Sequence, residues 1–230
     1  MSVQPFISTS FSGKAFLSYL NELRSLVGEK SVLMVLRKSG WLGNLRSLVS
    51  TKHEKITPSE VLVAVNKNIE EIFGETALRT VVFNAAKMSF RTCYGDAPVV
   101  KEARTWIQTH QENPMRLRAS LETIAYMIEA TSDQKVRMDE SSSHYHIVIQ
   151  DCIACWGLED QHSRYCYYNV GIIRGGLHYL FGKDDYPVQE LACITTGDQA
   201  CEFIVRKFPF SENERGSGKT GFLSLPAHLR

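Results

Sequence analysis

The sequence predicts an α+β fold in which helices pack on a four-stranded antiparallel sheet. Two observations lead to this prediction. Apolar residues recur at helical spacing up to Thr131, whereas beyond that point they alternate with a period of two. The second half then follows the order strand, strand, helix, strand, strand, which is typical of an antiparallel sheet covered by helices. A chain of 230 residues with 43% hydrophobic content is long enough to bury a core.

The first part of the chain predicts a helical hairpin. Phe16, Leu20 and Leu23 recur at helical spacing, and a second apolar stripe runs from Val32 to Leu42. The segment from Ser50 to Ile56 is polar and is expected to be a linker. We therefore expect residues 1–56 to form an N-terminal hairpin and linker, and not a separate functional module.

The next helix has a clear start and end in the sequence. Thr57-Pro58-Ser59-Glu60 predicts an N-cap, a proline at the first helical position and a capping box, and the helix should run to Phe73 and stop at Gly74. Further helices are expected over residues 75–91, 99–111 and 114–131. The first of these three is almost wholly apolar, so we expect it in the middle of the core.

The strands of the sheet are expected in two hairpins. Residues 136–150 alternate on either side of a turn at residues 139–143, and residues 186–194 and 200–208 flank Thr196-Gly197-Asp198. A helix from Ser163 to Phe181 lies between them, and its Gly171 and Gly175 predict close approach by a neighbouring helix or a ligand. Residues 57–210 would then form the main α+β domain, and the polar residues 211–230 a flexible tail.

Charge and targeting signals narrow the class of protein. A net charge of +1 gives no reason to expect binding to nucleic acid or to an anionic membrane. The start Met1-Ser2-Val3-Gln4-Pro5 lacks the basic and apolar segments of a signal peptide. We therefore expect a cytoplasmic protein, in which thiols stay reduced and clustered cysteines favour metal binding over disulfides.

The cysteines carry the main functional signal. Cys93 stands alone and predicts a buried small hydrophobic residue. The other five fall in the last third of the chain, as a C-x2-C pair, a single cysteine and a C-x7-C pair. They are Cys152, Cys155, Cys166, Cys193 and Cys201. Thiols gathered at strand ends and loops suit one soft tetrahedral ion, so we predict a zinc site.

Two interpretations of the cysteines remain open. Four thiolates around zinc leave no open position for water or substrate, so such a metal would be a structural cross-link. The turn at Gly197-Asp198 favours this interpretation, because it can bring Cys193 and Cys201 to one point. The alternative is a set of buried thiols without metal, and His162 is a possible replacement ligand.

Three segments resemble a known family, the vinyl-four-reductase domain. They are Asp151-Cys152-Ile153-Ala154-Cys155-Trp156-Gly157, the pair Tyr165-Cys166 before a glycine-bearing helix, and the stretch from Glu190 to Phe203. The helical units 17–42 and 60–94 are also similar to the N-terminal part of photosynthetic-bacterial and cyanobacterial members.

The resemblance implies a fold and a function. The family is similar in fold to TRAPP subunits, and its sensor members bind aromatic molecules beside a zinc ion. Cys166, Cys193 and Cys201 match three of the zinc ligands in those sensors. The fourth ligand there is a carboxylate, and this chain offers Cys152 or Cys155 in that region. The implied role is to bind a hydrophobic, aromatic or tetrapyrrole molecule, with a homodimer as the implied assembly.

A ligand pocket is expected among the apolar helices. The cofactor-binding candidates are Phe83, Met88, Phe90, Tyr167, Ile173 and His178, with Trp106, Tyr126 and Met127 nearby. Aromatic and methionine residues at helical spacing are more often core residues, so only a cavity would distinguish the two roles.

Other functions compete with ligand binding. One is an assembly factor for photosynthetic membrane-protein complexes, which would place the protein at the periphery of a photosynthetic membrane. Another is a vinyl reductase of (bacterio)chlorophyll synthesis, or its accessory subunit. No G-x-G-x-x-G motif follows a strand and opens a helix, so a hydride-supplying dinucleotide has no visible site, and the sequence favours binding over catalysis.

Overall fold

The described residues form an α+β structure with a four-stranded antiparallel sheet, which confirms the predicted class. The computed structural model describes residues 9–158, 165–182 and 186–208. The strands lie in the order β3 (Lys135–Glu140), β4 (His144–Gln150), β6 (Cys201–Arg206) and β5 (Val188–Ala192). Both predicted hairpins are present, although the second does not pair as one continuous ladder from 186 to 208.

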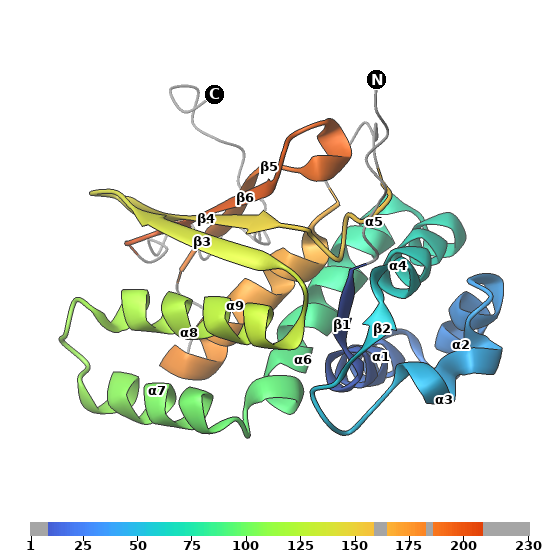
Figure 1. Cartoon of the computed structure of the whole chain (residues 1–230), viewed down its shortest axis with the longest axis horizontal. Helices are drawn as coiled ribbons and strands as arrows, with labels where there is room; N and C mark the ends of the chain where they lie inside the picture. The colour runs from blue at the N-terminus through green and yellow to red at the C-terminus, as the bar shows by residue number, and fades with distance from the viewer. Residues whose placement is uncertain (1–8, 159–164, 183–185, 209–230) are drawn as a thin grey trace.

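One face of the sheet packs on helices. Tyr145, Ile147 and Ile149 of β4 are buried, and His144 and His146 alternate with them and are less buried. Figure 1 shows the sheet lying across α8 (Arg116–Thr131) and α9 (Tyr167–Phe181). The pairing of Ile149 with Cys201 places the end of β4 beside the start of β6.

Two helices cross closely in the centre of the molecule. They are α6 (Phe83–Tyr94) and α9, and glycines on α9 make the close approach possible. A Cβ atom added at Gly171 would lie 2.6 Å from the carbonyl oxygen of Phe83, and one at Gly175 would lie 2.3 Å from that of Lys87. Of the two expected causes for these glycines, helix packing is the one observed.

The N-terminal hairpin is present and packs on the same core. It consists of α1 (Gly13–Val27) and α2 (Glu29–Lys38), which are joined by Gly28 with a φ of 83°. The short η1 (Leu42–Asn44) and α3 (Leu45–Leu48) follow it. In α1, Phe16, Tyr19 and Leu20 are fully buried. The predicted boundary near residue 56 stays a prediction.

The segment before the next helix differs from the prediction. Lys55–Pro58 forms a strand, β2, which pairs with β1 (Ser10–Ser12), and α4 (Ser59–Phe73) begins only after it. Thr57 pairs with Phe11, and its side chain donates to the carbonyl oxygen of Leu48 instead of capping the helix. The predicted end at Gly74 is confirmed, since this residue has a φ of 85°.

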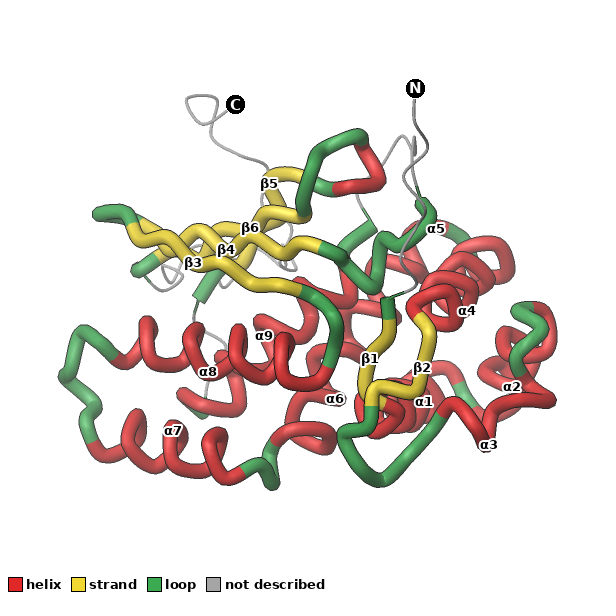
Figure 2. The backbone as a smooth tube through the Cα atoms, viewed as in Figure 1, coloured by secondary structure: helices red, strands yellow, loops and turns green. Residues whose placement is uncertain are grey.

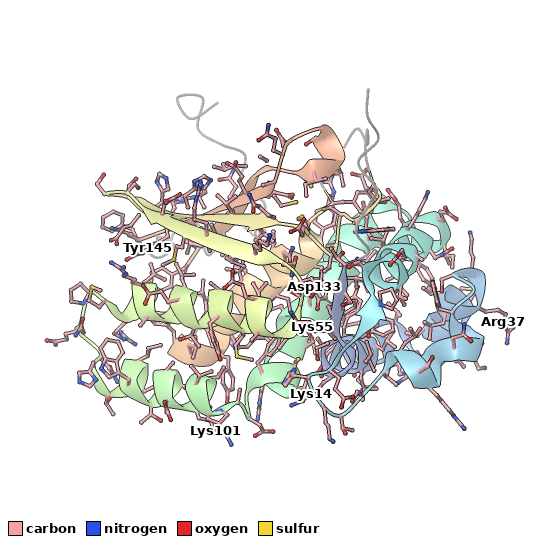
Figure 3. The ribbon with its side chains drawn as sticks, in the orientation of Figure 1. Lys14, Arg37, Lys55, Lys101, Asp133 and Tyr145 are labelled. Atoms are coloured by element: carbon pink, nitrogen blue, oxygen red, sulfur yellow. The ribbon has the colours of Figure 1, made fainter. Side chains whose placement is uncertain are left out.

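The carboxylate of Asp133 helps to attach the β1–β2 ribbon to the segment after α8, together with backbone pairing of Phe11 and Ser132. Asp133 accepts hydrogen bonds from the Ser10 amide and hydroxyl, both at 2.8 Å, and lies 3.2 Å from the Lys55 ammonium. Figure 3 shows Lys55 and Asp133 side by side where these elements meet.

The remaining helices enclose the central pair. The predicted helix over residues 75–91 is instead α5 (Glu75–Ala77), a π-helical turn η2 (Leu78–Val82) and then α6, and α7 spans Pro98–Thr109. Figure 2 shows α7 and α8 stacked on the side of the molecule away from α2. No helix of the described residues is long and apolar enough to cross a membrane. The expected tail, residues 211–230, lies outside the described residues.

Candidate metal centre

Five cysteines that are far apart in the sequence meet at one end of the sheet. Cys152 and Cys155 lie in the turn after β4, Cys166 is the residue before α9, Cys193 follows β5 and Cys201 begins β6. All five are buried, with at most 2% of any one of them exposed. The predicted convergence of these residues is therefore present.

Local structure explains how each loop presents its thiols. The C-x2-C turn follows Asp151, whose φ is 54°, and closes with a 3.2 Å hydrogen bond from the Cys155 amide to the Cys152 carbonyl oxygen. In the loop between β5 and β6, Asp198 accepts hydrogen bonds from the Cys193 amide at 2.9 Å and from the Thr196 hydroxyl at 3.0 Å. Gly197 between them has a φ of 91°, which favours glycine.

Four of the sulfur atoms form a tetrahedron of contacts. Cys166 lies 3.0 Å from Cys155, 3.1 Å from Cys201 and 3.9 Å from Cys193. The three remaining Sγ–Sγ separations are 3.5 Å for Cys155 to Cys193, 3.7 Å for Cys155 to Cys201 and 3.9 Å for Cys193 to Cys201. Four sulfurs bound to zinc at about 2.3 Å would lie about 3.8 Å apart. Cys155 therefore completes a zinc-sized set with the three cysteines that the resemblance implied.

Cys152 belongs to a second set that shares three of these sulfurs. Its Sγ lies 3.5 Å from that of Cys166, and the thiols of Cys152, Cys155, Cys166 and Cys201 all lie within 4.8 Å of one another. Both C-x2-C thiols thus reach the centre. Their spacing in the sequence could not distinguish them, because both sit in one short turn.

Polar side chains surround the sulfurs. The Asn169 amide nitrogen lies 3.2 Å from the Cys152 sulfur, and the Thr195 hydroxyl donates to the Cys193 sulfur at 3.0 Å. A carboxylate oxygen of Glu190, a residue only 6% exposed, lies within 4.8 Å of the sulfurs of Cys166 and Cys193. Hydrogen bonds from Cys155 and other thiols lower the pKa of Cys193, which favours a thiolate at this position.

The sequence contained signals for two of these residues that residue-by-residue reasoning missed. Glu190 stands three positions before Cys193, next to the C-x7-C pair. Asn169 is one turn after Cys166 in an otherwise apolar stretch of helix, so it falls on the same helical face. His162, the possible replacement ligand, lies outside the described residues.

The centre matches the chemistry of a soft tetrahedral ion. Its donors are thiols on four separate elements and they are enclosed by protein. Four of the six separations, 3.5 to 3.9 Å, are close to those of a four-sulfur zinc site, and the two shortest, 3.0 and 3.1 Å, lie below them. Such a site has no open position for substrate, so the ion would act as a cross-link.

A small cavity lies next to the centre. It holds about 10 Å³, which is room for about one water molecule, and Asn169 forms part of its wall. The Oδ1 atom of Asn169 is buried and has no hydrogen-bond partner in the part of the chain that the structure describes. The cavity is lined by residues of β1, α1, α6, α8, α9 and nearby loops, namely Phe11, Ala15, Tyr94, Ile128, Thr131, Ser132, Gln134, Ile153, Tyr168, Asn169 and Ile172.

The six predicted cofactor-binding residues occupy different surroundings. Phe90 and Ile173 are fully buried, Tyr167 is 5% exposed and Phe83 is half-buried. Met88 and His178 are exposed, the former to 44%. None of the six lines the cavity beside the centre, or a second, apolar cavity of about 10 Å³ between α1, α2 and α4. Their role in ligand binding stays a prediction.

Comparison with known proteins confirms the family resemblance for the part of the chain that holds the centre. Residues 145–207 match the family model of the vinyl-four-reductase domain, and all five clustered cysteines fall in this range. An uncharacterized protein of Methanocaldococcus jannaschii is 31% identical over 81 residues, which cover 35% of this chain and 50% of that protein. The chain thus spans about half the length of this curated relative.

Solved H-NOX structures share the overall fold. An Fe(II) unliganded H-NOX protein from K. algicida aligns with a TM-score of 0.56 and 11% identity, over 85% of this chain and 95% of that one. An Fe(II) H-NOX variant from S. oneidensis aligns with a TM-score of 0.52 and 12% identity, over 88% of this chain and 98% of that one. The phenol-responsive sensory domain of the transcription activator PoxR, crystallised with phenol, aligns with a TM-score of 0.48 and 16% identity, over 68% of this chain and 78% of that one.

Proposed function

We propose that this protein binds a small, largely apolar molecule without catalysing a reaction on it, and that a zinc ion in the cysteine centre stiffens the binding region. The observation that carries the proposal is the closed tetrahedron formed by Cys155, Cys166, Cys193 and Cys201 beside a partly polar cavity. The family match over the same residues supports it.

The wall of the cavity indicates which ligand chemistry fits. Phe11, Ile128 and Ile172 supply apolar surface. Asn169 lines the same cavity, and its Oδ1 is a buried acceptor that no described residue satisfies. A buried acceptor of this kind favours a guest with a hydrogen-bond donor. An aromatic alcohol such as phenol combines an apolar body with one hydroxyl donor, so it is the simplest match.

The volume of the cavity sets a condition on binding. About 10 Å³ accommodates one water molecule and not an aromatic ring, so the surrounding helices must move apart when the ligand enters. A tetrapyrrole would require a far larger opening. Phenol-sized ligands are therefore the favoured class within the broader range of hydrophobic, aromatic and tetrapyrrole guests.

Direct binding measurements test the proposal. The purified full chain is titrated with phenol, and separately with a porphyrin, while the midpoint of thermal unfolding is followed. We expect phenol to raise the midpoint in proportion to the logarithm of its concentration above Kd. Asn169→Leu should abolish this shift.

A matched variant separates ligand binding from general damage. Asn66 is as buried as Asn169, at 1% exposure, but it does not line the cavity beside the centre, and its Oδ1 accepts a 2.7 Å hydrogen bond from Tyr19. Asn66→Leu should lower the unfolding midpoint and still respond to phenol. No phenol response in the unmodified chain, or an equal response in both variants, would overturn the proposed site. The expected homodimer and the photosynthetic assembly partners stay predictions.

A further inference from the structure

The five sulfur atoms form two four-thiol sets that share three members. Cys155, Cys166 and Cys201 form a triangle with sides of 3.0, 3.1 and 3.7 Å between their sulfurs. Cys193 caps this triangle at 3.5 to 3.9 Å, and Cys152 lies within 4.8 Å of the same three sulfurs. Cys193 is not a member of the compact set that contains Cys152. Two sulfurs on the same side of this triangle would lie close to each other. The sulfurs of Cys152 and Cys193 are not in one compact set, so we infer that they lie on opposite sides of the triangle.

This arrangement is a pair of tetrahedra that share one face. An ion at one centre is bound by the three face sulfurs and Cys193, and an ion at the other centre is bound by the same three and Cys152. Two ions present together would be only about 1.5 Å apart for sulfurs spaced as in a zinc–thiolate site, which cation repulsion forbids. The centre would therefore hold a single ion, and it has one thiol more than four-coordination requires.

We propose that Cys152 and Cys193 exchange as the fourth ligand of a single ion, while Cys155, Cys166 and Cys201 remain bound in both states. This inference rests on the proposed metal binding. It assigns different roles to thiols that look equivalent in the sequence. Substitution of either apical cysteine then leaves a complete four-thiolate site, whereas substitution of a face cysteine does not.

The surroundings of the two apical sulfurs support exchange. Asn169 lies within hydrogen-bond distance of Cys152, at 3.2 Å, and Thr195 donates to Cys193 at 3.0 Å. Each apical thiol therefore keeps a polar partner when the ion is bound at the other position, which lowers the cost of leaving it unbound in the interior. Cys155, Cys166 and Cys201 would hold the ion in both states, so exchange of the fourth ligand would require only a short displacement, of about 1.5 Å.

Glu190 provides a competing outcome on one side. Its carboxylate oxygen lies within 4.8 Å of Cys166 and Cys193, so it is on the Cys193 side of the shared face. If Cys193 were lost and exchange did not occur, this carboxylate would be the nearest replacement ligand. The site would then have three sulfurs and one oxygen instead of four sulfurs.

Cobalt(II) distinguishes these outcomes, because its sulfur-to-metal charge-transfer absorption grows with the number of bound thiolates. The probe is Co²⁺ alone, added under reducing conditions to the metal-free full chain. We expect four-thiolate spectra for the unmodified chain, for Cys152→Ser and for Cys193→Ser. A variant that binds the ion through three thiolates instead of four should lose about a quarter of the charge-transfer intensity. We expect this loss for Cys155→Ser, for Cys201→Ser and for the double variant Cys152→Ser/Cys193→Ser.

The alternatives give different spectra. If Cys193→Ser loses that intensity while Cys152→Ser does not, or the reverse, the ligand set is fixed and exchange is overturned. If the unmodified chain binds no Co²⁺, the proposed metal centre itself fails, and exchange fails with it. Far-ultraviolet circular dichroism of each variant identifies any that is unfolded. For such a variant, the same comparison is made with Cys→Ala in place of Cys→Ser.

Discussion

The sulfur atoms of Cys166 and Cys201 lie 3.1 Å apart, although the two residues are separated by 35 positions in the sequence. One thiol stands at the start of α9 and the other at the start of β6, so this contact joins the central helix to the sheet. Two thiolates at this distance repel each other unless a cation lies between them. We therefore expect the fold of the region that matches the vinyl-four-reductase family to depend on whether a metal ion occupies the centre.

Removal of a face ligand should weaken metal binding and lower stability. Cys166→Ser is expected to leave the ion with three thiolates, to bind zinc more weakly and to lower the midpoint of thermal unfolding by roughly 10 °C or more, because zinc binding is folding free energy in such sites. Cys93→Ser is the matched control, since Cys93 is equally buried, at 1%, but lies on α6 outside the centre. Zinc content by elemental analysis and thermal unfolding measure both effects. A Cys166→Ser protein that retained zinc with an unchanged midpoint would contradict the cross-linking role.

Thiol reactivity should depend on the metal and not on exposure alone. In the native zinc-loaded protein we expect no reaction of the six cysteines with a thiol reagent at pH 8, since five are bound or enclosed at the centre and Cys93 is buried. Addition of a strong chelator should accelerate modification of the five clustered thiols. Mass spectrometry of the modified protein gives the sites. Equal labelling rates with and without chelator would argue against a bound ion.

The buried thiol of Cys93 predicts a dependence of stability on pH. Burial raises the pKa of Cys93 to about 12, whereas an unfolded chain has an ordinary thiol pKa near 8.5. The folded state therefore holds this proton more tightly, and its contribution to stability is complete below about pH 8.5 and declines as the pH rises towards 12.

This decline can be isolated by a comparison of two proteins. Between pH 8 and pH 10, the difference in unfolding free energy between the unmodified chain and Cys93→Ala should narrow by about 2 kcal/mol. Urea unfolding at both pH values measures it. A difference that stayed constant would mean that Cys93 does not keep its proton in the folded state.

The crossing of α6 and α9 should tolerate no side chain at Gly175. A methyl group there would lie 2.3 Å from the backbone oxygen of Lys87, and backbone cannot move aside as a flexible side chain can. Gly175→Ala is expected to destabilise the protein by about 2–3 kcal/mol. Gly43→Ala is the control, because no atom lies within 4 Å of an added Cβ at that position. Similar unfolding free energies for both variants would rule out the tight crossing.

Local sequence signals predicted much of the fold because they act over short distances. Gly74 and Gly182 end their helices with φ values of 85° and 80°, as a glycine after an apolar helical run predicts. Alternating residues likewise identified β3 and β4. The start of α4 was predicted too early, because Thr57 is used in a strand pair with Phe11, and such a distant partner has no local signature.

The site was predictable in composition and not in arrangement. The sequence identified all five clustered cysteines, since their number and spacing are unusual for a reduced protein. That Cys152 and Cys193 lie on opposite sides of one triangle depends on how β4, β5 and α9 meet, which only the tertiary structure provides. The small cavity beside Asn169 arises from the packing of α1, α6, α8 and α9 and likewise has no signature in the sequence.

The central claim is that one ion is bound directly by four cysteine sulfurs, and X-ray absorption at the zinc edge tests it most directly. The measurement uses the full chain purified without added metal, after its zinc content has been determined. We predict one zinc per chain and a first shell of four sulfur atoms at about 2.3 Å, with no nitrogen or oxygen. A shell dominated by nitrogen or oxygen, or a folded protein that holds no metal and has five free thiols, would contradict the claim.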